Sequence, residues 1–243
     1  MKKSKPFTRN KRGYYNIKKV DHVSVTTFLK VIGKHFLMGW YASMERKKIL
    51  RIITRGIEKG YSAKLVLKLV IKHCEQVKGY AADKYIFKRG DAGNVIHKAI
   101  DSYLATGKKP KIKDKKHKKA FKNFLKWWKT AGYEVIETEC VISDPNLEGA
   151  GPVAGTMDAY LRRKKDKKKG IIDWKTGKNV YAEHHLQLNT YRHLARKSHP
   201  SSFGMIIHVP QDGGKVTEHK VDSKKFPLAT AMAALRLWRG LNE

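Results

Sequence analysis

Two aspartates and a lysine have a spacing that could place them on one face of a β-hairpin: Asp158, Asp173 and Lys175. Residues 153–161 and 170–174 have the composition typical of strands, and the charged turn RRKKDKKKG lies between them. A hairpin centred on this turn makes Asp158 and Asp173 direct cross-strand partners, with Cβ atoms about 5 Å apart. Lys175 then points to the same face as Asp173, and Trp174 points to the opposite face, into a core.

This arrangement favours metal-assisted chemistry on a phosphodiester. Two carboxylates at that separation repel each other unless a cation compensates, and Mg²⁺ prefers carboxylate oxygens while it keeps several water ligands. Such an ion can polarise a phosphodiester and activate water, and Lys175 would orient the nucleophile or stabilise the developing negative charge. The same residues also fit an Asp–Lys ion pair at a sheet edge, because charged cross-strand pairs are common.

The composition indicates a polyanionic partner. The 243 residues include 53 Lys and Arg against 21 Asp and Glu, which gives a formal net charge of +32. Nucleic acid is the first candidate partner and an anionic membrane is the second. The apolar runs are far shorter than the roughly 20 residues that a membrane span needs. We expect the partner to be DNA and not a membrane.

The cysteines and histidines do not have the pattern of a metal-binding framework. Cys74 and Cys140 are the two cysteines of the chain, too few for a four-cysteine cluster, so we expect no iron–sulfur cluster. Four histidines between residues 184 and 199 have no clean spacing for a zinc ligand set: His184, His185, His193 and His199. This use of cysteine is typical of a reducing, intracellular environment.

The elements that must position these residues change in periodicity near residue 132. Residues 1–20 have the composition of a basic, flexible arm. Residues 21–131 form a region of helical periodicity. Residues 132–243 form the expected catalytic α/β core. Strands are predicted at 133–142, 153–161, 170–174, 203–209 and 215–221, and helices at 183–197 and 224–241.

Three expectations concern the N-terminal region and its aromatic residues. Ser24 or Thr26 could cap a helix that continues through residues 28–40. The leucines of residues 63–77 predict a buried helix. In the basic helix predicted at 114–131, Trp127 is expected to face outward, where it could stack on a nucleic-acid base.

Three motifs resemble the signature of the PD-(D/E)XK nucleases: GTMD at 155–158, IIDWKTG at 171–177, and Gln187-Leu188 followed by Tyr191. More narrowly, they resemble the RecB-type exonuclease branch, which includes mitochondrial and phage exonucleases. Residues 23–27 (VSVTT) resemble the N-terminal segment of this branch, and residues 93–97 (GNVIH) resemble its helical G-x-x-x-H motif. Glu139 falls on the strand where the branch often carries a glutamate. The matches run from about residue 22 to residue 191.

The resemblance implies a fold and a set of site residues. The fold would be a restriction-endonuclease-like α/β core, a central mixed sheet flanked by helices, behind the N-terminal helical region. Residues 21–131 of that region would contribute to DNA binding and supply one metal ligand. The activity would be Mg²⁺- or Mn²⁺-dependent hydrolysis of DNA. Lys175 would be the catalytic lysine, with Gln187 and Tyr191 lining the site. The implied metal ligands are Asp158, Asp173, His97 and the backbone carbonyl of Trp174.

Other residues keep more than one interpretation. Glu139 is a metal ligand, a hydrogen-bond partner of a ligand, or a solvated strand residue. Ser24 and Thr26 contact backbone phosphate or act only as helix caps. The remaining residues expected to contact DNA are Thr176 and the exposed lysines of the basic helix, Lys122, Lys126 and Lys129.

The expected function is a DNA exonuclease that acts on single-stranded or duplex ends, in phage or bacterial recombination, repair or degradation. By the same analogy we expect it in the cytoplasm of a bacterium or a phage-infected cell. The alternatives are a structure-specific endonuclease and a non-catalytic nucleic-acid-binding protein with a nuclease-like fold. The sequence leaves open whether a helicase or recombination partner exists.

Overall fold

The computed structural model describes residues 9–32, 36–75 and 81–243. Residues 1–8 of the expected basic arm therefore lie outside the described residues. The chain divides into two compact units, one formed by Met1–Ile32 with Gly93–Glu243 and the other by Gly33–Ala92. The expected boundary near residue 132 falls inside the first unit, because the strands within residues 14–24 belong to the same sheet as those after residue 132.

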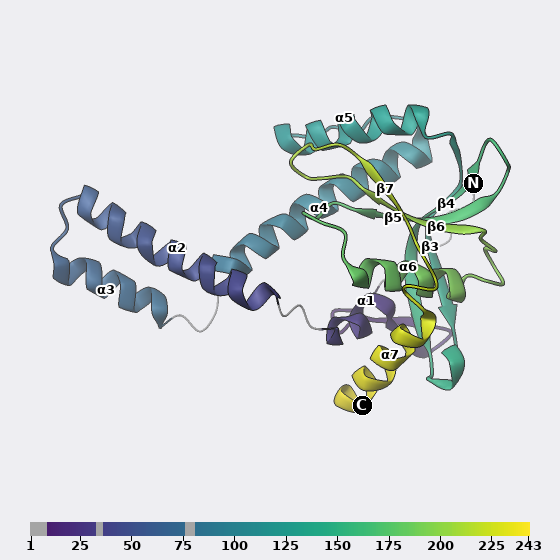
Figure 1. Ribbon diagram of the computed structural model, residues 1–243, viewed down its shortest axis with the longest axis horizontal. Coiled ribbons are helices and arrows are strands. Elements are labelled where there is room, and N and C mark those ends of the chain that lie inside the picture. The colour runs from purple at the N-terminus through teal and green to yellow at the C-terminus, as the bar shows by residue number, and fades with distance from the viewer. Residues whose placement is uncertain (1–8, 33–35, 76–80) are drawn as a thin grey trace. The chain divides into compact units, whose positions relative to one another are not determined.

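The first unit is built on a mixed seven-stranded sheet (Figure 1). The order is β1-β2-β4-β5-β6-β7, and β3 pairs with β4 off this path. The β2–β4 and β5–β6 pairs are parallel, and the other pairs are antiparallel. The strands are β1 Tyr14–Ile17, β2 Val20–Ser24, β3 Tyr133–Asp144, β4 Val153–Arg163, β5 Lys169–Lys175, β6 Phe203–His208 and β7 Thr217–Lys220.

Helices cover both faces of this sheet, and the strand and helix order predicted after residue 132 is confirmed. The helices of the chain are α1 Val25–Phe28, α2 Phe36–Glu58, α3 Ala63–Cys74, α4 Ala81–Thr106, α5 Lys115–Thr130, α6 Ala182–Leu194 and α7 Leu228–Asn242, with short 3₁₀ turns at Leu29–Val31 and Leu147–Gly149. Residues of α1, α6 and α7 pack on one face in what we call the α6-side cluster. Residues of α4 and α5 pack on the other face in the α5-side cluster.

The edge of β4 that faces β2 and β5 is divided between these two strands. Val23 and Ser24 of β2 pair with Val153 and Ala154, and β5 pairs with residues 159–162. Among the described residues, 155–158 have no strand partner on this edge. The sheet is therefore forked where Asp158 lies.

Trp174 anchors the sheet to α5, as its alternation in the strand predicts. Its side chain is fully buried in the α5-side cluster, and its ring lies 5.5 Å from Phe124 and 6.3 Å from Trp127. Trp127 was expected to face outward, and this prediction is wrong. Its ring packs among the aromatic residues of this cluster, and its Nε1 donates a hydrogen bond to Glu218 at 2.8 Å.

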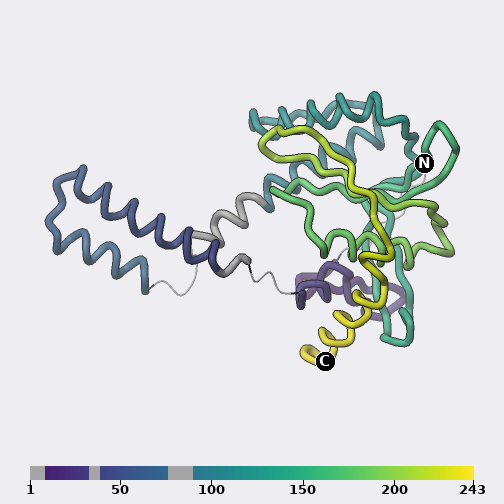
Figure 2. Tube along the Cα trace, in the orientation of Figure 1, coloured from purple at the N-terminus to yellow at the C-terminus, as the bar shows by residue number. Residues whose placement is uncertain are grey.

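The described part of the expected flexible arm is ordered instead. Residues 14–24 form the β1–β2 hairpin, which brings β2 beside the start of β4 (Figure 2). The hairpin turns at Lys18 and Lys19, which both have positive φ, 50° and 65°. Such a turn normally takes Asn or Gly, so a Lys-Lys pair gives no turn signal in the sequence.

The helix expected from Ser24 through residue 40 is shorter. Ser24 does cap a helix, because its side chain accepts a hydrogen bond from the backbone N–H of Thr27 at 3.1 Å. That helix, α1, ends at Phe28, and α2 begins separately at Phe36. Residues 33–35 lie outside the described residues.

The second unit contains α2, α3 and the first part of α4. The predicted helix at 63–77 is present as α3, and residues 76–77 lie outside the described residues. Its leucines are not buried as expected: Leu65 is 40% exposed and Leu67 is 59% exposed. The helix packs on α2 through one side. A helix that packs on a single neighbouring helix buries only a narrow stripe of its surface. Among the described residues, α3 has more leucines than such a stripe can cover.

We expect Gly155→Ala to destabilise the protein by about 1–3 kcal/mol, because its Cβ would overlap the buried ring of Tyr191. Gly240→Ala is the matched control, since Gly240 lies in α7 with open space around its Cβ position. Chemical denaturation of both variants checks the prediction. Equal stabilities for the two variants would contradict the tight packing of α6 on β4.

Candidate active site

Asp158 and Asp173 meet at the fork in the sheet, in the predicted hairpin register. The β4–β5 ladder pairs Tyr160 with Ile171 and Ala159 with Ile172. One further step along each strand reaches Asp158 and Asp173. There the ladder ends, and Asp158 Oδ2 accepts a hydrogen bond from the backbone N–H of Trp174 at 2.7 Å. A carboxylate thus takes the place of a strand partner.

Asp173 lies in a hydrogen-bonded network with Lys175 and α6. Lys175 Nζ lies 2.6 Å from Asp173 Oδ2 and donates to Gln187 Oε1 at 3.1 Å. Gln187 Nε2 donates to Asp173 Oδ1 at 3.2 Å and to the Tyr191 hydroxyl at 3.0 Å. The amide of Gln187 can therefore point only one way, with its oxygen towards Lys175. The structure brings together these four predicted residues, and Gln187 fixes the positions of the two charged groups.

His97 reaches the same site from α4. Its Nδ1 lies 3.8 Å from Asp158 Oδ2, and its ring donates a hydrogen bond to the backbone carbonyl of Trp174. Burial, together with the nearby charge of Lys175, lowers the pKa of His97 to about 4. The imidazole is consequently neutral at neutral pH, which is the form that binds metals.

Gly93 explains how α4 comes close enough. A Cβ atom at Gly93 would lie 2.9 Å from Thr176 Oγ1 and 3.4 Å from Gln211 Nε2. Glycine therefore lets this turn of α4 pack closely on the segment that follows β5. His97 lies about one helical turn further along, so the close approach sets its reach. The G-x-x-x-H spacing has this physical basis.

Glu139 faces Asp158 across the β3–β4 ladder. The pairs Thr138–Ala159 and Cys140–Met157 flank this position. Glu139 has a φ of 53°, a left-handed conformation that costs a residue with a side chain roughly 1–3 kcal/mol. Its side chain is exposed and hydrogen-bonds to Asp101 of α4. Glu139 therefore belongs to the acidic group around Asp158.

Asp101 is a site residue that the sequence analysis missed. Burial, together with the charges of Glu139 and Asp158, raises its pKa to about 9. Asp101 Oδ1 is buried without a hydrogen-bond partner among the described residues. The available signal was its spacing, because Asp101 follows His97 by four residues and so shares one helix face with it.

The donor set fits a hard divalent cation. Burial raises the pKa of Asp158, and the negative charge of Asp173 raises it further. Four carboxyl groups thus converge on a region where Lys175 is the one lysine in contact, among the described residues. Carboxylate oxygens, the Trp174 carbonyl and a neutral imidazole are suitable ligands for Mg²⁺ or Mn²⁺. The buried, unpartnered oxygen of Asp101 also favours a cation here.

The predicted DNA contacts Ser24, Thr26 and Thr176 lie in less open positions. Ser24 is 2% exposed and caps α1. Thr26 accepts a hydrogen bond from Arg9 Nη1 at 2.6 Å. Thr176 is buried, and its hydroxyl accepts a hydrogen bond from Gln211 at 3.4 Å. The geometry gives Ser24 and Thr176 structural contacts, and their contact with DNA stays a prediction.

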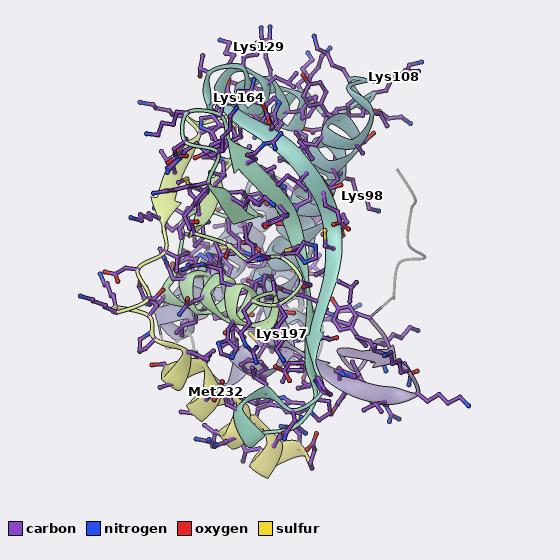
Figure 3. The ribbon with its side chains drawn as sticks, turned by 90° about the vertical axis from the view of Figure 1, so that its right-hand side faces the viewer. Lys98, Lys108, Lys129, Lys164, Lys197 and Met232 are labelled. Atoms are coloured by element: carbon purple, nitrogen blue, oxygen red, sulfur yellow. The ribbon has the colours of Figure 1, made fainter. Side chains whose placement is uncertain are left out.

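The three lysines of α5 lie on its exposed side. Lys122, Lys126 and Lys129 are exposed, while Phe121 and Phe124 of the same helix are buried in the α5-side cluster. Lys129 lies at the same end of the first unit as Lys164 of the β4–β5 turn (Figure 3). The backbone N–H of Lys164 donates to Gly132 O just after α5, which keeps the turn beside the helix. This end offers a concentrated positive charge.

We expect Asp101→Asn to raise the melting temperature in the absence of divalent metal. An acid with a raised pKa keeps its proton in the folded state, so the free energy of unfolding falls as pH rises from 3.8, its unfolded pKa, towards about 9. The asparagine removes this loss, and the gain should grow over the same pH interval. Thermal denaturation in EDTA between pH 5 and about 9 measures it.

Asp166→Asn is the control for this measurement. Asp166 is an exposed residue of the β4–β5 turn, and its hydrogen bond with Arg163 lowers its pKa to about 2. A lowered pKa contributes stability above the unfolded pKa, so this variant should gain none. A melting temperature of Asp101→Asn below that of the wild type at pH 8 would show that burial of this carboxyl group does not destabilise the folded state.

Comparisons with known proteins give a family match for the chain. The family model described as the PD-(D/E)XK nuclease superfamily matches residues 71–240. A solved structure described as SSO0001 is similar, with 16% identity, a TM-score of 0.44, and coverage of 93% of this chain and 79% of that chain. No curated protein shows significant similarity to the chain. None of the described helices is long and apolar enough to cross a membrane.

Proposed function

Because the chain belongs to the PD-(D/E)XK nuclease superfamily, we propose that it is a divalent-metal-dependent deoxyribonuclease that degrades DNA from free ends. One observation carries the proposal: Asp158, Asp173, Lys175 and His97 converge at the sheet fork, in contact with the groups that fix them. A module that only binds DNA gains nothing from buried acids that face a polyanion. Resemblance of the G-x-x-x-H and Q-x-x-x-Y motifs to the RecB-type branch supports action at ends.

In this proposal a Mg²⁺ or Mn²⁺ ion, when bound, supplies charge neutralisation at the phosphate and a water of lowered pKa. Asp158, Asp173, His97 and the Trp174 carbonyl are the groups that would hold it, with Glu139 and Asp101 beside them. The carboxyl groups of Asp158 and Asp101 have raised pKa values and would lose their protons as the cation binds. Metal binding should therefore release protons. The exact ligand set follows from metal-binding measurements on single variants.

Lys175 would orient the attacking water and stabilise charge on the phosphate. Its Nζ is held by Asp173 on one side and by Gln187 on the other, at 2.6 and 3.1 Å. Because the Tyr191 hydroxyl fixes the orientation of Gln187, the ammonium group has a defined position before substrate arrives. Such preorganisation removes a reorganisation cost from the reaction.

The α5 lysines would hold the DNA backbone. They contact phosphate without reading sequence, and each neutralised phosphate adds about 0.9 to the slope of log K against log salt on duplex DNA. The high net charge of +32 favours this mode of binding.

We expect Asp173→Asn to abolish cleavage, with a loss of at least about 1,000-fold, because it weakens metal binding and leaves Lys175 without its partner. The measurement uses end-labelled linear DNA beside a covalently closed circle of the same sequence, in Mg²⁺ or in EDTA. Asp166→Asn, an exposed acid on the β4–β5 turn, should cleave like the wild type. Metal-dependent loss of the linear substrate alone supports the exonuclease.

Other outcomes of this assay would change the assignment. Cleavage of the closed circle at a comparable rate would indicate an endonuclease. DNA binding without cleavage in Mg²⁺ or Mn²⁺ would reject the nuclease activity of this chain. Full activity of Asp173→Asn would place the reaction elsewhere.

We expect the triple variant Lys122→Gln, Lys126→Gln, Lys129→Gln to bind duplex DNA more weakly and to lower the salt slope by about 2–3. Fluorescence anisotropy in EDTA, over a range of salt concentrations, gives both values without cleavage. Lys197→Gln is the control, because Lys197 is exposed and lies away from the α5 lysines (Figure 3). An unchanged slope in the triple variant would exclude α5 as the DNA-binding helix.

A further inference from the structure

A second group of metal-binding side chains lies apart from the active-site acids. Glu137 and Cys140 of β3 and His199, which follows α6, place a carboxylate oxygen, a sulfur and an imidazole nitrogen within 4.8 Å of one another. His199 Nε2 lies 3.1 Å from Glu137 Oε2. The three residues belong to the first unit and come from two segments that are distant in the sequence. Three different donor types meet here at ligand spacing.

This group is separate from the catalytic cluster although Cys140 is next to Glu139. Cys140 is buried in the α6-side cluster, whereas Glu139 contacts Asp101 of α4, whose neighbours belong to the α5-side cluster. The left-handed backbone at Glu139 changes the alternation of β3, so Glu137 and Cys140, three residues apart, come together. The group formed by Glu137, Cys140 and His199 is therefore distinct from the acids around Asp158.

The imidazole of His199 is held in the orientation that a metal ligand needs. Its Nδ1 lies 2.9 Å from Ser198 Oγ, which leaves Nε2 to face Glu137. The ring of Tyr160 packs edge-on against it, with centroids 5.1 Å apart at 87°. Metal-binding histidines are typically fixed in this way, through a hydrogen bond at the other ring nitrogen.

Access from solvent is one-sided. The side chains of Glu137 and His199 are 48% and 17% exposed, and Cys140 lies beneath them, 5% exposed. An ion can therefore enter past the carboxylate and the imidazole and reach the sulfur. A fourth position is left for water on the exposed side.

We propose that Glu137, Cys140 and His199 bind a zinc ion. Zn²⁺ takes sulfur, nitrogen and oxygen donors in a four-coordinate site, whereas Mg²⁺ prefers oxygen donors alone. The site therefore selects a different ion from the catalytic site. On binding, the thiol of Cys140 loses its proton to the buffer and a Zn–S bond forms. The ion would replace the direct contact between Glu137 and His199.

The bound ion would act as a clamp behind the active site. It would join β3, which carries Glu139, to the segment that follows α6, the helix of Gln187 and Tyr191. Both elements supply residues to the candidate active site, Glu139 from β3 and Gln187 and Tyr191 from α6. Zinc binding should therefore raise the thermal stability of the protein, by an amount set by its affinity and concentration.

Co²⁺ substitution tests the site without any measurement of cleavage. Co²⁺ added to the metal-free full-length protein should produce a sulfur-to-cobalt charge-transfer band with a stoichiometry of one, and Zn²⁺ should displace it. The chain has two cysteines, so Cys74→Ser is the matched control and should keep the band. Cys140→Ser should lose it, and His199→Asn should weaken Zn²⁺ binding by at least about tenfold.

The outcomes separate the proposal from the proposed function. A band that survives in Cys140→Ser, or no band in the wild type, overturns the zinc site and leaves the nuclease untouched. Zn²⁺ affinity equal in wild type, Cys140→Ser and His199→Asn also overturns it, because binding is then at the carboxylates of the catalytic site. Circular dichroism checks that each variant is folded. If Cys140→Ser or His199→Asn does not fold, Glu137→Gln replaces it as the test variant. Glu137→Gln keeps the side-chain shape and should weaken Zn²⁺ binding.

Discussion

Repulsion among the carboxyl groups around Asp158 is the constraint on which the first unit depends. The charges of Asp173 and Glu139 raise the pKa of Asp158, and those of Glu139 and Asp158 raise the pKa of Asp101. Lys175 contacts Asp173. Acids kept this close without a cation are costly, so the surrounding structure must hold them there. It does so from four elements, β3, β4, β5 and α4. The cost becomes an advantage when a cation binds, because the ligands are already in place.

The forked edge of β4 makes this gathering possible. A continuous ladder would use the backbone groups near Asp158 and keep its carboxylate on one face. At the fork, that carboxylate instead accepts the backbone N–H of Trp174, and Gly155 leaves room for Tyr191. Trp174 in turn is fixed by the aromatic residues of α5. Packing on one face of the sheet thus positions the charged groups on the other.

The sequence predicted the parts of the site that follow from local pattern. The turn between β4 and β5 set the register of Asp158 and Asp173, and alternation placed Trp174 in the core. It did not predict the left-handed backbone of Glu139 or the Lys18–Lys19 turn, because neither residue type favours positive φ. Asp101 was missed because its role depends on the contact between α4 and β3, which no local pattern encodes. The leucines of α3 predicted a buried helix, but several of them are exposed. A local apolar pattern does not specify how many neighbours a helix has.

The parallel pairing of β2 with β4 has a consequence for synthesis on the ribosome. The β1–β2 hairpin leaves the ribosome early, but its partner segment, Val153–Ala154, emerges only after all of residues 25–152 have been made. Gln187 and Tyr191, which fix Lys175 and contact Asp173, emerge later still. An incomplete chain therefore has an unpaired β2 edge and no organised active site. Assembly of the site is thereby confined to molecules whose synthesis has passed residue 191.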